Sequence, residues 1–224
     1  MWGVRKGSSI QLVRWIVLKS KLIVVKIKSK KRVFRRITFM KDVALVIVKF
    51  TVSLISLSFF MFTNALYSCG MGAARLVAVK MEMQDKKKQI KSYRYVGVII
   101  SLASIFYILY SIRLFFGGET ETYPMHVALL IALYTFVEFG INIREAFKLR
   151  KSKVLEAKAL RAISLASTLL CFVLTQTAIT SFATEGDNSF NNALSGVIFG
   201  GFAAIIGFRL IADSYAYQTE SIGQ

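Results

Sequence analysis

The sequence predicts an all-α fold, a polytopic transmembrane helical bundle. Of its 224 residues, 55% are hydrophobic, with 18 phenylalanines and 9 tyrosines, which is too apolar for an ordinary soluble domain. Short loops of alternating charge separate about five long apolar stretches, each with the roughly 20 residues that a helix needs to cross about 30 Å of hydrocarbon. The stretches are residues 43–67, 95–116, 123–143, 162–183 and 190–212.

A basic leader precedes the first stretch. Thirteen lysines and arginines lie between Arg5 and Lys41. From Ile10 to Ile27 such cations alternate with aliphatic residues, which is typical of an amphipathic helix on the surface of a bilayer that contains anionic lipids. The alternative is that the leader is upstream sequence translated from a misplaced start.

The first apolar stretch, 43–67, has basic segments on both sides, so a single crossing leaves one of them outside the cell. Three arrangements remain open. Translation from Met40 gives an outward N-terminus without the leader, or residues 43–81 form a broken element that enters and leaves on one side, or the leader itself crosses the membrane. The third is least favoured, because each cation inside the leader costs about 2.5 to 3.5 kcal/mol at mid-bilayer.

Charge in the loops predicts the topology of the later stretches. Loops 68–94 and 144–161 each carry seven lysines or arginines, whereas residues 117–122 and 184–189 carry acidic charges alone. By the positive-inside rule, the two basic loops and the C-terminus are cytoplasmic in a multi-pass protein of the cell membrane, and spans two to five form two antiparallel hairpins. The predicted domains are the leader (1–41), a transmembrane domain (42–217) and a short cytoplasmic tail (218–224).

A weak internal repeat accompanies the hairpins. Residues 100–104 and 163–167 are both Ile-Ser-Leu-Ala-Ser, and Ala65–Ser68 resembles Ala132–Thr135. The predicted unit, of about 65 residues, is a helix that descends to a basic turn and a helix that rises to an acidic turn. This repeat favours an outward start for the first span.

Polar residues inside the apolar stretches are the candidate functional residues. Glu138 and Arg209 lie at similar depths, and an ion pair between them would offset much of the cost of burying either charge. In the alternative, Arg209 reaches the inner headgroups and Glu138 pairs with Arg144 or with water. Gln176, near mid-span, predicts either a hydrogen bond between helices or part of a water-lined path.

Small residues predict close helix packing in the last span. Gly196 and Gly200 form a GxxxG pattern, and Gly201 and Gly207 follow. Glycines at this spacing let two helix backbones approach closely.

The sequence carries no pattern that predicts catalysis. It lacks a Walker loop, a dinucleotide fingerprint, a nucleophile elbow and an HExxH motif. A single histidine, His126, and two cysteines give no ligand spacing for a metal. We therefore expect no enzyme activity, no catalytic residue, no metal and no cofactor, and the apolar residues among the leader's cations argue against nucleic acid as a partner.

Two function classes remain. The first is an interaction protein, an accessory or immunity-type subunit of a membrane complex, whose partners are the bilayer and either another protein or further copies of itself. The alternative is a small channel or transporter with a polar path near spans three to five. The lysine- and isoleucine-rich composition has a bacterial character, although composition does not identify a source.

Overall fold

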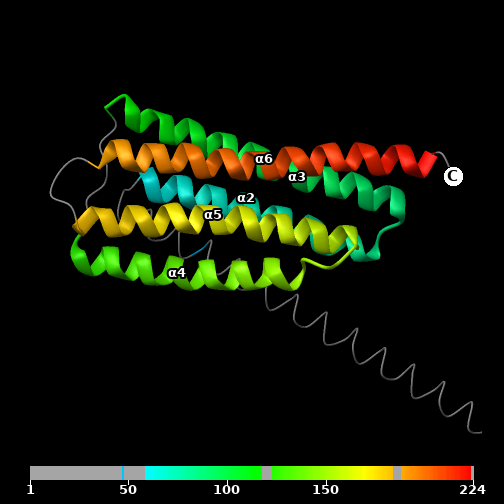
Figure 1. Cartoon of the computed structure of the whole chain (residues 1–224), viewed down its shortest axis with the longest axis horizontal. Helices are drawn as coiled ribbons and strands as arrows, with labels where there is room; N and C mark the ends of the chain where they lie inside the picture. Colours follow the sequence, from blue (N-terminus) through cyan, green and yellow to red (C-terminus); the bar gives the residue numbers. More distant parts are fainter. Residues whose placement is uncertain (1–46, 48–58, 118–122, 184–187, 223–224) are drawn as a thin grey trace, which may run out of the picture. The chain divides into compact units, whose positions relative to one another are not determined.

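The computed structural model describes Ile47 and residues 59–117, 123–183 and 188–222, all within the unit Asp42–Gln224. The elements are α2 (Phe59–Lys80), the short 3-10 helix η1 (Met81–Met83), α3 (Lys86–Phe115), α4 (Met125–Lys148), α5 (Leu155–Ala183) and α6 (Ser189–Ile222) (Figure 1). The predicted all-α helical bundle is confirmed. The predicted leader, residues 1–41, lies outside the described residues.

Four of the described helices, α3 to α6, are long and apolar enough to cross a membrane. They coincide, to within two residues at the end away from the basic turns, with the second to fifth predicted spans. Helix α4, the shortest of them with 24 residues, is about 36 Å long. Helix α2 contains the end of the first predicted stretch, 43–67, and apart from Ile47 the rest of that stretch lies outside the described residues.

The connections at one end are shorter than the sequence predicted. Only residues 81–85 join α2 to α3 where we predicted a loop over 68–94, and only residues 149–154 join α4 to α5 where we predicted 144–161. Likewise, α6 continues to Ile222 through most of the predicted tail. The helices extend beyond the predicted spans because hydropathy ends a span where polar residues begin, whereas a helix satisfies its own backbone hydrogen bonds in lipid and in headgroups alike.

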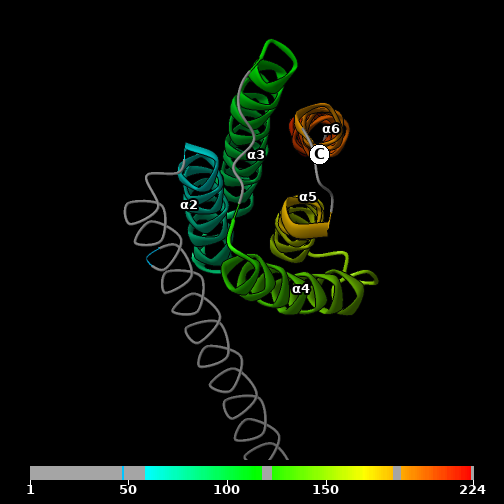
Figure 2. The same cartoon turned by 90° about the vertical axis from the view of Figure 1, so that its left-hand side faces the viewer.

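Helix α5 lies between α4 and α6, as the end-on view shows (Figure 2). Helices α3 and α6 pack along much of their lengths, as do α4 and α5, and α2 contacts both α3 and α5. Among the described helices, only α5 brings its backbone close to that of α4. The burial of the helices agrees with this arrangement. In the most apolar segment of each helix, 61% of α5 is buried, compared with 28% of α4. Helix α5 is therefore central and α4 is peripheral.

The α2–α3 and α4–α5 turns lie at the same end of the bundle as the C-terminal end of α6 (Figure 1). We call this the basic end. Helices α2 with α3 and α4 with α5 form two antiparallel hairpins, whereas the sequence predicted hairpins within spans two to five, which are α3 to α6. Helices α5 and α6 do pack together, but the backbones of α3 and α4 do not approach each other closely. Because each basic turn joins the two helices of one observed hairpin, both turns face one side of any membrane that the bundle crosses.

Glycine and proline shape the opposite end. Gly117, just after α3, has a φ of 88°, in the left-handed region that glycine adopts without a steric cost. Pro124 precedes α4, and its carbonyl accepts hydrogen bonds from the backbone N–H groups of Val127 and Ala128 at 2.9 and 3.0 Å. The missing N–H of proline costs nothing at the start of a helix.

Candidate functional site

Polar side chains gather where α4 meets α5. They recur every three or four residues, which keeps them on one face of each helix. On α4 they are Thr135, Glu138, Asn142 and Glu145, and on α5 they are Ser164, Thr168, Cys171 and Thr175. We call these eight residues the polar seam. Because the two helices are antiparallel, Thr135 contacts Thr175 at one end of the seam and Glu145 contacts Ser164 at the other.

Near the basic end, Arg75 of α2 forms an ion pair with Glu145 of α4. Nη1 of Arg75 donates to both carboxylate oxygens, at 2.9 and 2.7 Å. Nη2 donates to Oγ of Ser164 at 3.4 Å, and this hydroxyl donates to Oε2 of Glu145 at 2.9 Å. The side chain of Arg75 is 5% exposed and that of Glu145 is 19% exposed. We call these three residues the ion-pair cluster.

The ion-pair cluster joins three helices. The backbones of α2 and α4 do not approach each other closely, so the long arginine side chain connects the first hairpin to the second. Moving either charge out of water costs several kcal/mol, which only a close partner and further hydrogen bonds offset. Glu145 has both, from Arg75 and from Ser164. The cluster therefore has the geometry that makes buried charge tolerable.

Apart from Glu138, the remainder of the polar seam consists of uncharged side chains. The hydroxyls of Thr135 and Thr175 lie 2.8 Å apart, and each also lies 2.8 Å from a carbonyl oxygen of its own helix, that of Ile131 for Thr135 and that of Cys171 for Thr175. Since each hydroxyl has one proton, one of the two donates across to the other, which donates within its own helix. Nδ2 of Asn142 lies 4.0 Å from Sγ of Cys171. These contacts hold α4 against α5.

The structure does not bring Glu138 and Arg209 together. Glu138 is half-buried in the polar seam on α4, and Arg209 is exposed on α6. The two helices do not contact each other, because α5 lies between them (Figure 2). The predicted pair used matching depth alone, and depth does not specify which helices are neighbours. Arg209 lies in the half of α6 nearer the basic end of the bundle, which favours the alternative that it reaches the headgroups.

The other two polar candidates have different surroundings. Arg144 is exposed, since it is turned about 100° around α4 from its neighbour Glu145. Gln176 of α5 is half-buried, and its Oε1 accepts a hydrogen bond from Oγ of Ser195 on α6 at 2.9 Å. The contact of Gln176 thus connects helices, which is one of the two roles that the sequence predicted for it.

Sequence reasoning missed all three members of the ion-pair cluster as functional residues. Arg75 and Glu145 fell within predicted loops, and Ser164 was one hydroxyl among many in its span. The sequence did contain a pattern that points to Glu145. Thr135, Asn142 and Glu145 follow one another at intervals of seven and three, which identifies a polar stripe on α4 that continues into the predicted loop.

Three of the four candidate glycines of α6 lie against α3. A Cβ added at Gly196 or Gly200 would meet side-chain carbons of Ser111 or Ile108 at 2.8 Å. At Gly207 it would meet backbone atoms of α3. At Gly201 it would meet nothing within 4 Å, because one residue further along a helix faces about 100° away, so Gly201 packs against no other helix of the described bundle.

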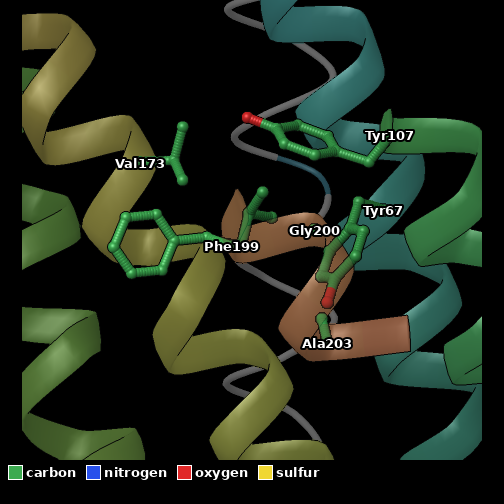
Figure 3. A pocket seen from close by; sticks show the side chains of 7 residues that line it. Tyr67, Tyr107, Val173, Phe199, Gly200 and Ala203 are labelled. Atoms are coloured by element: carbon green, nitrogen blue, oxygen red, sulfur yellow. The ribbon is translucent and has the colours of Figure 1, made fainter. Parts of the chain in front are cut away.

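A small cavity lies between α2, α3, α5 and α6 (Figure 3). Its volume is about 10 Å³, and the rings of Tyr67 and Tyr107 and the backbone of Gly200 border it. The hydroxyl of Tyr67 donates to the carbonyl of Ala166 at 3.2 Å. A space of this size is at the lower limit for a single water molecule, so we exclude this cavity as a substrate site.

The described residues contain no group of three or more His, Cys, Asp or Glu side chains that could hold a metal ion. No protein-family profile and no curated protein matches this chain. Its function must therefore be argued from the polar seam and the surfaces of the bundle.

Proposed function

We propose that this protein acts by binding another membrane protein, as an accessory or immunity-type subunit, and that it does not carry a solute. The observation that supports this is how its buried charges are used. The carboxylate of Glu145 accepts hydrogen bonds from Arg75 and Ser164, and Arg75 donates to Ser164 as well. Charges engaged in this way fix helices in place, whereas a transported ion needs ligands that exchange partners.

The neutral part of the polar seam supports the same proposal. The hydroxyls of Thr135 and Thr175 lie 2.8 Å apart, so α4 and α5 meet through a direct contact. The bundle then offers its outer surface to a partner. The exposed faces of α3 and α4 are apolar and suit either lipid or a partner's membrane helices.

A second candidate, a small channel or transporter, has one observation in its favour. Glu138 is a half-buried carboxylate inside a candidate membrane span, one turn before Asn142 in the polar seam. Ionisable residues at such positions often belong to proton or ion paths.

The two candidate functions predict different results for ion flux through the protein and for crosslinking to other proteins. We would reconstitute the full chain in liposomes and compare ion flux for the wild type, Glu138→Gln and Gln176→Leu, with Glu156→Gln as a control that removes the same charge near the start of α5. In native membranes, a photo-crosslinking residue would replace Leu133 or Phe136 on α4, and Leu102 or Leu109 on α3. All four side chains are more than 60% exposed.

We expect no flux from any variant and a protein adduct of one defined mass from one of the two faces. Adducts to lipid alone from all four positions would contradict the proposed function. Flux that Glu138→Gln abolishes and Glu156→Gln leaves intact would make transport the function.

A further inference from the structure

The helices that reach the basic end are longer than a membrane requires. Helix α3 has 30 residues and α6 has 34, which correspond to about 45 and 51 Å, against about 30 Å of hydrocarbon. The excess of α3 lies at its start, because Lys86–Arg94 is cationic and the apolar run begins afterwards. The turns at the basic end therefore extend into the headgroup layer.

Tyrosines paired with cations mark the start of that layer. The guanidinium of Arg94 lies 3.9 Å from the ring centroid of Tyr215, and its Nε donates to Oγ of Ser214 at 3.0 Å. Nζ of Lys158 donates to the hydroxyl of Tyr217 at 2.6 Å. Tyrosine prefers the boundary between hydrocarbon and headgroups. From Arg94 back to the start of α3 is about 12 Å, enough to cross the headgroups.

Two groups of exposed cations lie in this layer. One is Lys86, Lys87 and Lys88 after the α2–α3 turn, and the other is Arg150, Lys151 and Lys153 in the α4–α5 turn. In the part of the chain that the structure describes, none of these six forms an ion pair with an acidic residue. Arg75 behaves differently, since it points inward to Glu145. The six cations are therefore available to anions outside the protein.

An exposed apolar side chain accompanies each group. Met83 in the α2–α3 turn is 83% exposed, and Val154 at the end of the α4–α5 turn is 58% exposed. Apolar side chains beside lysines and arginines are typical of segments that lie at a bilayer surface, because the cations meet phosphates while the apolar groups reach the acyl boundary. An acidic soluble partner would pair with the cations, but it would provide no acyl layer for the exposed apolar side chains.

We infer that the two basic turns together bind the headgroups of anionic phospholipids. We call Met83, Val154 and the six cations the headgroup surface. The two turns lie at one end of the bundle, and η1 contacts α5, which connects the first turn to the helix that follows the second (Figure 1). The surface is thus part of the folded bundle and does not depend on the basic leader.

The test measures lipid retained by the full chain purified in a neutral detergent. Native mass spectrometry would count bound phosphatidylglycerol and phosphatidylcholine after incubation with equal amounts of each. In the turn variant, glutamine replaces all six cations of the headgroup surface. In the leader variant, which carries the same change in charge, glutamine replaces Lys26, Lys28, Lys30, Lys31, Arg32 and Arg35.

We expect the turn variant to lose the preference for phosphatidylglycerol by at least about fivefold, as expected for several cations that attract anionic lipid. The leader variant should keep at least half of the preference. Met83→Gln with Val154→Gln should lower retention of phosphatidylglycerol with no change in charge. Circular dichroism would verify that each variant remains helical.

Two outcomes would overturn the inference. One is an equal loss in both variants, which would mean that net charge alone attracts the lipid. The other is displacement of the bound lipid by an acidic peptide or by inorganic phosphate at matched charge, which would identify a soluble anion as the preferred ligand.

Discussion

Replacing Gly207 with alanine should separate α3 from α6. A Cβ at this position would lie 2.7 Å from the backbone nitrogen of Ser101 and 2.9 Å from the carbonyl oxygen of Gly97. Both are backbone atoms, so no side-chain rotation relieves the contact, and α3 must retreat by about half an ångström. The two helices form one of the most extensive interfaces of the bundle, so this movement loosens many other contacts.

The expected cost follows from two opposing effects. Overpacking in a well-packed interface costs about 1 to 3 kcal/mol, and alanine recovers up to about 1 kcal/mol of helix propensity relative to glycine. Because the obstacle is backbone, we expect a net loss of about 2 kcal/mol. For a chain of 224 residues this lowers the midpoint of thermal unfolding by about 4 to 8 °C.

Thermal unfolding of the detergent-purified chain, followed by circular dichroism, measures this loss. Gly201→Ala is the matched control, because its Cβ meets nothing within 4 Å and the variant should be as stable as the wild type or more so. Gly97→Ala should resemble Gly207→Ala, and the double variant should lose less than the sum, since separated helices accommodate a second methyl group more cheaply. Equal melting of Gly207→Ala and Gly201→Ala would refute the reasoning.

Three further predictions concern the ion-pair cluster, the basic end and the topology. Glu145→Leu should cost about 3 kcal/mol or more in chemical unfolding, whereas Arg75→Leu with Glu145→Leu should cost about 1 kcal/mol or less, and equal losses would argue against a direct pair. Arg94→Gln should lower stability by about 1 kcal/mol through loss of the Tyr215 and Ser214 contacts, and Arg94→Lys should recover less than half of it. Cysteines at Lys87 and Lys153 should react with an impermeant maleimide from the same side of the membrane, and labelling from opposite sides would contradict the two hairpins.

The fold class could be predicted from sequence because lipid imposes a simple requirement. Every backbone group in hydrocarbon must be satisfied internally, so each crossing is a long apolar helix that composition reveals. The charges of the loops at 68–94 and 144–161 then predicted which turns share an end. The ends of the helices were harder to predict from the sequence, because α3 and α6 continue into polar segments that hydropathy does not identify as helical.

The buried charges could not be predicted in the same way. A scale that assigns each residue its own cost excludes Arg75 from the interior, and the cost changes only when Glu145 and Ser164 are known to be neighbours. The partner of the GxxxG pattern could not be predicted from the sequence either. It identified Gly196 and Gly200 but did not show that α3 is the partner, or that Gly97 of α3 contributes the matching close approach to Gly207.

Two long side chains of α2 converge on one turn of α5, and this convergence gives the ion-pair cluster a specific role. Tyr67 donates to the carbonyl of Ala166, and Arg75 donates to Ser164 two residues earlier. Leucines of similar size would avoid the cost of desolvating a charge, so the pair is a poor choice for stability alone. Apolar contacts between leucines are not directional, so an apolar face would pack almost as well after a small rotation or shift of α2. Hydrogen bonds between charged groups are directional. Because both carboxylate oxygens of Glu145 lie within 2.9 Å of Nη1 of Arg75, we expect the pair to restrict the rotation and depth of α2, and thereby to set how the first hairpin lies against the second.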